Sequence, residues 1–550
     1  MISGENDKCS HIVYIFMIQF PSDIGMGQSP QPLGIDCLRA KRKAVAIVVR
    51  SGVVYTVGFD NDKYLKLQSE KILERIALFG NKLYLEFGGK LLDDQHAARV
   101  LPGYMPDTKV HLLETLKDKA EIVIAINASD IDSSKAIGDS GVSYDDDVLR
   151  LIDEFRKRNL YVGSVVISQY LGQPAADQFK TYLESLGVTV YVMHYIPGSY
   201  YPSNIQLILS DIGYGNNDYI ETERPLVVIT APGPGSGKMA ACLSQLYQEN
   251  KRGVKAGYAK FETFPIWNRP LKHMIHLAYE AATADLDDVN MIDPFHLEAY
   301  GVSAVSYNRD IEVFPILNAM FTRIWGESPY RSPTDMGVNM AGFCISDDAV
   351  CTEASKQELI RRYFNTQLDF AKGNIQKSAV SKLELLMNNS GLSSDERPPV
   401  TPALAKAEKT DGPCVAIELP DGTVITGKTS DLLGASSAAL LNALKHLAGI
   451  DDRVPLISPA LIAPIQKLKV GYLGNENPRL HTDEVLIALA ISTATNPTAE
   501  IVLEQLPKLN YSEAHSSVIL SQVDIGVFRQ LGVNITCEPV YQNKRLFHRN

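Results

Sequence analysis

Short apolar runs alternate with helical segments between residues 82 and 230, and this alternation constrains the fold more than any other feature of the sequence. The runs are rich in Val, Ile and Leu: KLYLEF (82–87), EIVIAIN (121–127), SVVIS (164–168), VTVYVM (188–193) and LVVIT (226–230). Amphipathic stretches at 145–157 and 175–186 lie between them. Buried strands separated by helices are typical of a parallel sheet with helices on both faces. We therefore predict an α/β fold, with a doubly wound, mainly parallel sheet in a domain over residues 58–255.

The rest of the chain divides by composition. Residues 256–395 are predicted to be mainly helical, with polar loops suited to binding. A linker rich in Pro and charge is predicted at 396–413, followed by a C-terminal α/β domain at 414–550. That domain opens on alternating residues around Asp421-Gly422, which predicts a β-hairpin. Further strands are predicted at the apolar runs 455–458 and 517–521 and at the final NITCE.

Residues 1–57 are expected to be an N-terminal extension outside the main fold. An apolar stretch at 12–20 follows Glu5, Asp7 and Lys8, so the basic flank of a secretion signal is missing. No apolar run reaches the roughly 18 residues that a membrane span needs. Translation from an upstream start codon is one explanation of this segment.

Charge and cysteine content narrow the classes of partner. Lys plus Arg number 53 and Asp plus Glu number 64, giving a net charge of −11. A diffuse acidic surface argues against a dedicated binder of nucleic acid or anionic membranes. The seven cysteines are an odd number without a CxxC pair, which is typical of a reducing compartment. We expect a cytoplasmic homo-oligomer with no nucleic-acid or membrane partner.

The sharpest motif is the segment PLVVITAPGPGSGKMAACLSQLYQE (225–249), in which a strand runs through a glycine-rich turn into a helix. Such a turn exposes successive backbone N–H groups and points a helix N-terminus at an anion. The predicted ligand-binding residues are Gly233, Gly235, Ser236, Gly237 and Lys238. The glycines would permit close backbone approach, and the lysine would supply positive charge. The motif favours a small phosphorylated ligand over the alternative of a turn needed only for packing.

The motif departs from a complete phosphate-binding P-loop at two positions. Pro232 stands where the pattern has its first glycine, and Met239 stands where a Ser or Thr would place a hydroxyl on Mg²⁺. ATP or another phosphate ligand with Mg²⁺ would then need a carboxylate from elsewhere. Asp211 and Asp293 end apolar runs and are the candidates, with Lys238 completing the predicted catalytic set. Lys260 and Glu262, soon after the helix, could line the same cleft.

A different reading places a metal on a helix. His273, His276 and Glu280 are spaced to share one helical face, which would suit a metal-dependent hydrolase. The chain lacks HExxH and GxSxG, so the zinc-peptidase and serine-hydrolase signatures are not met.

Taken together, these segments resemble a bacterial family of uncharacterised proteins known only as a domain of unknown function. The resemblance runs from about residue 58 to 541 and rests on KLYLEFGGKLLDD, TAPGPGSGKMAACLSQLY, GYAKFETFPIWN, SPTDMGVNMAGF and AIELPDGTVITGK, among others. It implies an N-terminal α/β unit, a helical insertion and a C-terminal unit of deaminase-like topology. Some members are labelled ATP-dependent peptidases, but this chain offers no protease nucleophile or zinc motif in a recognisable arrangement.

Three functions remain open at this point: the metal-dependent hydrolase already described, at His273, His276 and Glu280, and two that use the glycine-rich loop. The first is an enzyme of phosphoryl transfer or nucleotide hydrolysis that uses Lys238 to stabilise charge. The second is a non-catalytic oligomer that binds a phosphorylated ligand on the same loop. Met239 in place of a hydroxyl favours the second, and the polar loops over 258–343 favour the first.

Overall fold

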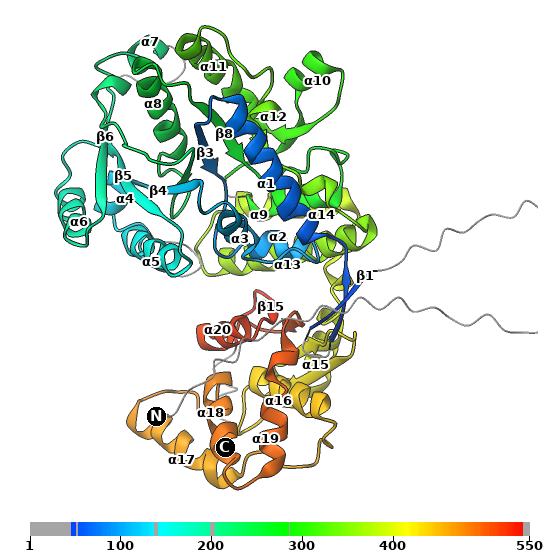
Figure 1. Ribbon diagram of the computed structural model, residues 1–550. Coiled ribbons are helices and arrows are strands. Elements are labelled where there is room, and N and C mark those ends of the chain that lie inside the picture. The colour runs from blue at the N-terminus through cyan, green and yellow to red at the C-terminus, as the bar shows by residue number, and fades with distance from the viewer. Residues whose placement is uncertain (1–45, 51–52, 137–140, 198–203, 285, 543–550) are drawn as a thin grey trace, which may run out of the picture. The chain divides into compact units, whose positions relative to one another are not determined.

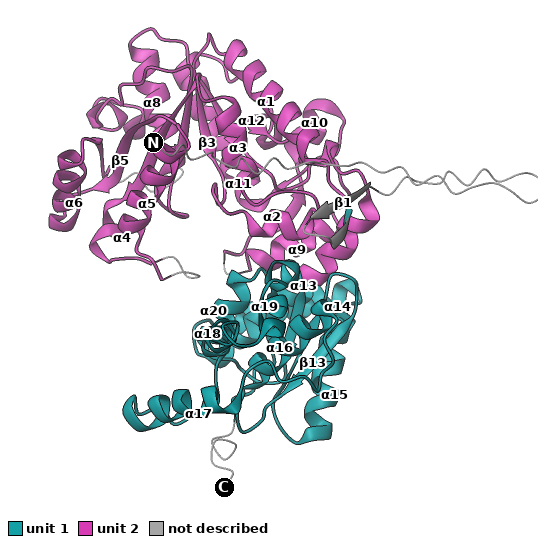
Figure 2. Ribbon diagram, turned by 60° about the horizontal axis from the view of Figure 1, so that its bottom comes forward, with its two compact units in different colours: residues 1–57, 359–550 teal, residues 58–358 magenta. Residues whose placement is uncertain are grey.

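The computed structural model describes residues 46–50, 53–136, 141–197, 204–284 and 286–542. The chain forms two compact units (Figure 2): residues 58–358 make one, and residues 359–550 with 1–57 make the other. In the second unit β1 (Ala46–Arg50) and β2 (Val53–Val57) pair as an antiparallel hairpin. The apolar stretch at 12–20 lies outside the described residues.

The unit of residues 58–358 is built on a seven-stranded sheet in the order β11-β8-β3-β7-β4-β5-β6 (Figure 1). Every neighbouring pair is parallel, which confirms the predicted α/β class and parallel sheet. The strands are β3 (Leu83–Phe87), β4 (Ala120–Asn127), β5 (Val162–Tyr170), β6 (Thr189–His194), β7 (Leu226–Thr230), β8 (Gly257–Phe261) and β11 (Gly337–Val338). Two of them, β8 and β11, come from the region expected to be mainly helical, so the sheet extends past residue 255.

Helices cover both faces of this sheet and bury its central strands on both sides. The longer ones are α1 (Asn61–Leu78), α3 (Thr108–Thr115), α5 (Tyr144–Lys157), α6 (Pro174–Ser185), α8 (Lys238–Lys251), α9 (Met274–Ala282) and α11 (Asn308–Trp325). The shorter ones are α2 (Gln95–Val100), α4 (Ala128–Asp132), α7 (Ile205–Ile208), α10 (Pro294–Tyr300) and α12 (Pro333–Met336). A small antiparallel hairpin joins β9 (Asn290–Ile292) to β10 (Val305–Tyr307).

The second unit holds a mixed four-stranded sheet in the order β13-β12-β14-β15, in which only β14 and β15 are parallel. Its strands are β12 (Cys414–Glu418), β13 (Val424–Lys428), β14 (Glu513–Ser516) and β15 (Asn534–Cys537). The antiparallel pairing of β12 with β13 confirms the hairpin around Asp421-Gly422. The strands expected at 455–458 and 517–521 are absent from the described sheet, and the polar run EAHS of β14 takes the inner position instead. A likeness to deaminase topology stays a prediction.

Helices complete this unit: α14 (Lys377–Ser390), α15 (Val400–Thr410), α16 (Ala435–Ala448), α17 (Pro459–Lys467), α18 (Thr482–Ser492), α19 (Pro497–Leu503) and α20 (Gln522–Gln530). The residues of α13 (Asp348–Ala371) divide between the two units. The segment 396–413, expected to be a linker, contains α15. Its prolines stand at the helix start, Pro399 at the cap and Pro402 in the first turn, where a missing N–H breaks no intrahelical bond.

Within the described ranges, no helix combines the length and the apolar character needed to cross a membrane.

Candidate functional site

The glycine-rich loop, residues 231–238, connects β7 to α8 at the carboxyl edge of the parallel sheet (Figure 1). Strand β7 lies between β3 and β4, near the middle of the sheet. From β4 the chain continues through β5 to β6 at one edge of the sheet, whereas from β7 it continues to β8 on the other side of β3. The connections that leave the neighbouring strands β4 and β7 therefore run in opposite directions. Crevices at such positions are where open α/β sheets bind ligands.

The loop's backbone needs its glycines. Gly235 and Gly237 have φ of 81° and 88°, a left-handed conformation that side chains disfavour. A Cβ at Gly237 would lie 2.5 Å from the Ser168 hydroxyl, and one at Gly233 would collide with the Tyr144 hydroxyl. The glycine spacing therefore reflects both backbone angle and close packing.

Hydrogen bonds hold the loop with its carbonyl groups turned to the protein. Ser236 Oγ donates to the carbonyl of Gly233 at 3.0 Å, Ser168 Oγ donates to that of Ser236 at 2.9 Å, and Asn127 Nδ2 donates to that of Gly235 at 3.3 Å. The backbone N–H groups of residues 237–240 find no acceptor among the described protein groups. Free N–H groups in the first turn of a helix form a ready anion site.

The side chain of Lys238 folds back over the glycine-rich loop, with its Nζ 3.5 Å from the Gly233 carbonyl oxygen. The residue is half-buried, and burial lowers the pKa of its ammonium, although the carboxylate of Glu86 opposes that shift. Among the described residues Lys238 belongs to no ion pair, in contrast to Lys251 at the other end of the helix. A poorly solvated ammonium that has no carboxylate at ion-pair distance favours an anion beside it.

The charges of Glu86 and Lys260 act on this lysine. Both belong to a group of charged residues, here called the charged cluster: Glu86 on β3, Lys260 on β8, Glu262 just after β8, and Asp310 on α11. Lys260 Nζ is 2.9 Å from Glu262 and 2.5 Å from Asp310. Tyr258 donates to Glu86 at 2.6 Å. The charge of Lys260 lowers the pKa of Lys238, and Glu262 is connected to this pair only through its own ion pair with Lys260.

Glu262 has an unusual protonation equilibrium for a carboxyl group. Burial raises its pKa from 4.5 to about 7; the ion pair with Lys260 opposes that shift, and the charge of Asp310 adds to it. A carboxyl group that exchanges its proton near neutral pH is suited to proton transfer.

This raised pKa predicts how stability responds to pH. A group whose pKa is higher in the folded state stabilises the fold fully below its unfolded pKa of 4.5, and that contribution is lost as pH rises through about 7. Relative to Glu262→Gln, the wild-type protein should therefore lose about 3 kcal/mol of unfolding free energy between those pH values. Urea unfolding of both proteins across this range measures the difference. A difference that does not change with pH would contradict the assignment.

The two predicted carboxylate partners of the loop lie elsewhere. Asp211 is exposed and pairs with Lys251 at the last turn of α8, which is about 20 Å from the first turn. Asp293 is buried and caps α10, accepting from the backbone of His296 at 3.0 Å and from the Thr334 hydroxyl at 2.7 Å. Neither is among the groups whose charges act on Lys238.

The predicted helical metal site is also not assembled. His273 precedes α9 as its N-cap, so helical spacing does not apply to it, and its Nε2 faces Asp348 at 3.1 Å. Glu280 accepts from Asn290, and burial lowers the pKa of His276 to about 4. Over the ranges that the structure describes, no three His, Cys, Asp or Glu side chains converge on a point that could hold a metal.

Sequence reasoning missed Glu86 and Asp310. Glu86 is the one charged residue of β3, LYLEF, and a charge in an otherwise apolar, buried strand is the signal that could have identified it. Asp310 carried no such signal because it stands in the polar first turn of a helix, where Asp is common.

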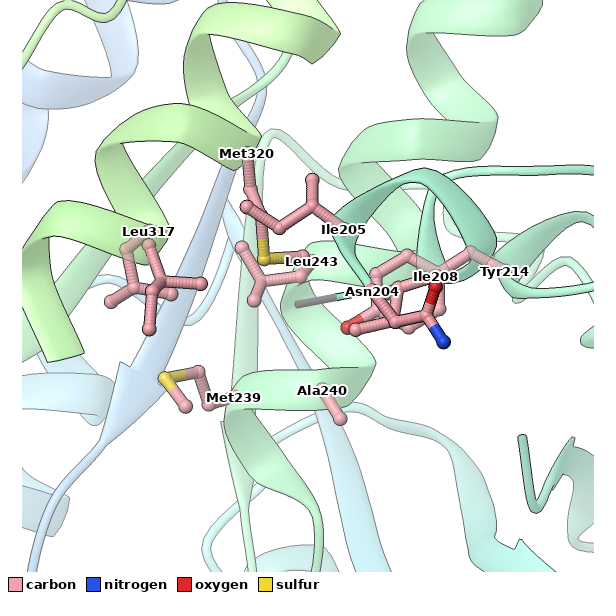
Figure 3. A pocket seen from close by; sticks show the side chains of 10 residues that line it. Asn204, Ile205, Ile208, Tyr214, Met239, Ala240, Leu243, Leu317 and Met320 are labelled. Carbon is pink, nitrogen blue, oxygen red and sulfur yellow. The ribbon is translucent and has the colours of Figure 1, made fainter. Parts of the chain in front are cut away.

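An apolar cavity of about 100 Å³ adjoins the first turns of α8 (Figure 3). Met239, Ala240 and Leu243 of α8 form one wall, and side chains of α7 and α11 form the others. The remaining lining residues are Asn204, Ile205, Ile208, Tyr214, Ile316, Leu317 and Met320.

Comparisons with known proteins give the family. Residues 57–391 match the model of "Domain of unknown function DUF1846, N-terminal", and residues 395–547 match "Domain of unknown function DUF1846, C-terminal". A UPF0371 protein of Streptococcus thermophilus is 58% identical over 491 residues, covering 89% of this chain and 99% of the relative. A UPF0371 protein of Streptococcus pyogenes serotype M5 is 58% identical over 494 residues, covering 90% and 100%.

These names state no activity, and in particular no peptidase activity. The matches cover both units and confirm the resemblance seen in the sequence. The chain therefore belongs to the DUF1846 family.

Proposed function

We propose that the glycine-rich loop binds the phosphate group of a nucleotide or phosphorylated metabolite. The observation that carries this proposal is the combination of Lys238, half-buried and outside any described ion pair, with the unpaired N–H groups of residues 237–240. Backbone N–H groups and an ammonium at one helix N-terminus together supply hydrogen bonds and positive charge to a phosphate. The left-handed backbone of Gly235 and Gly237 and the close packing of Gly233 and Gly237 hold those donors in place before the ligand arrives.

A second candidate function is catalysis at the same place. The observation that favours it is Glu262, which has a pKa of about 7 and forms an ion pair with Lys260, the lysine whose charge acts on Lys238. A carboxylate there could take the proton of a hydroxyl or water that attacks the bound phosphoryl group. Turnover of phosphate esters that rises with pH through about 7 and is lost in Glu262→Gln, with phosphate binding retained, would support the enzyme over the non-catalytic binding protein.

A thermal-shift panel tests the binding proposal. Inorganic phosphate, pyrophosphate, ATP and sugar phosphates are added to the full-length protein, each with and without Mg²⁺. A ligand at about 100 times its Kd should stabilise the folded protein by about 2.7 kcal/mol and raise the melting temperature accordingly. Because Met239 replaces the metal-binding hydroxyl, we expect inorganic phosphate to act without Mg²⁺. No shift with any phosphate, at any concentration up to millimolar, would contradict the proposal.

A further inference from the structure

The apolar cavity lies directly beside the first turn of α8. Met239 and Ala240 are the second and third residues of that helix, so the same turn that offers free N–H groups also forms a wall of the cavity. Figure 3 shows Met239 and Leu243 on the side of the helix toward Leu317 and Met320 of α11, and Ala240 on the side toward Asn204. If a phosphate ester binds with its phosphate at the helix N-terminus, the organic group attached to the phosphate would lie beside this cavity.

The cavity's chemistry is apolar. Isoleucine, leucine and methionine side chains from α7, α8 and α11 make most of its lining, and Asn204 and Tyr214 are its polar members. An empty apolar cavity lowers stability, because its walls lose packing contacts. A cavity placed against a ligand-binding turn is therefore more simply explained as the place of an apolar part of that ligand.

The cavity's size limits what fits. An apolar cavity of about 150 Å³ accommodates benzene, so about 100 Å³ accommodates roughly four carbon atoms. A purine base is larger than benzene and does not fit, whereas a short aliphatic chain does.

We infer that the ligand is a phosphate ester of a short aliphatic group, with its phosphate on the glycine-rich loop and its carbon chain in the apolar cavity. This inference rests on the proposed function, because the loop must bind phosphate first. It goes further by excluding the nucleotide base as the occupant of the cavity and by naming the chemical class of the ligand.

A homologous series of ligands tests it in the wild-type protein. Isothermal titration compares inorganic phosphate, methyl phosphate, n-butyl phosphate and AMP. Each buried methylene is worth about fourfold in affinity, so n-butyl phosphate should bind about 50-fold more tightly than methyl phosphate. AMP should not bind more tightly than methyl phosphate by a comparable factor. Equal affinities for methyl and n-butyl phosphate, with phosphate itself binding, would overturn the inference while leaving the proposed function intact. Failure of every ligand to bind would overturn both.

Two isoleucines provide a matched pair of variants. Ile208→Phe adds bulk from the α7 wall, away from the loop, and should reduce the preference for n-butyl over methyl phosphate to a few-fold without changing phosphate affinity. Ile212→Phe makes the same change at a position that is 73% exposed and outside the lining, and should keep the wild-type preference. If a folded Ile208→Phe protein keeps the wild-type preference for n-butyl over methyl phosphate, the carbon chain of the ligand binds outside this cavity and the inference is overturned.

Discussion

Replacing Lys238 with alanine is expected to weaken the binding of phosphate ligands about 100-fold. A hydrogen bond to a charged group contributes about 1.5–3 kcal/mol, and the upper part of that range applies here because the ammonium is shielded from water. The backbone N–H groups of residues 237–240 remain, so some affinity should survive. Isothermal titration with inorganic phosphate measures the change.

The control for this variant lies on the same helix. Lys251→Ala removes the same charge from the last turn of α8, where the lysine is exposed and paired with Asp211, and should leave phosphate affinity unchanged. Stability gives an independent readout. Since Lys238 is poorly solvated and lacks a described carboxylate partner, Lys238→Ala should not lower the melting temperature of the ligand-free protein. Equal phosphate affinity in Lys238→Ala and Lys251→Ala would show that the lysine takes no part in binding.

The largest expected effect on stability comes from Arg397 in the second unit. Its side chain is fully buried and forms an ion pair with Glu513 at 2.6 Å. It also donates to the Thr536 hydroxyl and to the carbonyl groups of Ala514 and Asn534, so it ties the residues before α15 to β14 and β15. Substitution by methionine would leave these acceptors buried with fewer donors.

Arg397→Met should therefore lower the free energy of unfolding by about 3–5 kcal/mol, the usual effect of removing one member of a buried ion pair. Urea unfolding of the full-length chain measures the loss, and hydrogen exchange of peptides covering β14 and β15 localises it. Arg453→Met is the matched control, because Arg453 is 90% exposed and water screens its ion pair with Asp451, so this variant should unfold much as the wild-type protein does. A loss below 1 kcal/mol in Arg397→Met would mean that Glu513 is satisfied by Arg361 alone.

The alternating pattern predicted the strands from β3 to β7 because each contains a short run of buried, mainly apolar residues, which is longest in β4 and complete in β7. It did not predict β8, where Lys260 interrupts the apolar run, or β11, which is two residues long. In the second unit, β14 has the polar sequence EAHS, and its His515 is satisfied by Thr536 and Glu538 from the neighbouring strand region. Such a strand depends on partners distant in sequence, which periodicity does not reveal.

The candidate site likewise has one part that the sequence predicts and one part that it does not. The glycine-rich loop was predictable because its backbone geometry is determined by eight consecutive residues. The charged groups around Lys238 were not, because Glu86 and Lys260 come near it only through the order of strands, and Asp310 meets Lys260 only through the packing of α11. Asp211 and Asp293 had the expected positions after apolar runs, yet one pairs with Lys251 and the other caps a helix. Position after an apolar run therefore could not distinguish a ligand-facing carboxylate from a capping one.

A crystal structure of the protein soaked in phosphate tests the central claim most directly. We expect a tetrahedral anion within about 3 Å of the backbone nitrogens of residues 237–240 and of Lys238 Nζ, which are ordinary hydrogen-bond distances. The contrary result is a glycine-rich loop without an anion at a phosphate concentration that saturates binding in solution, with the phosphate found at another place.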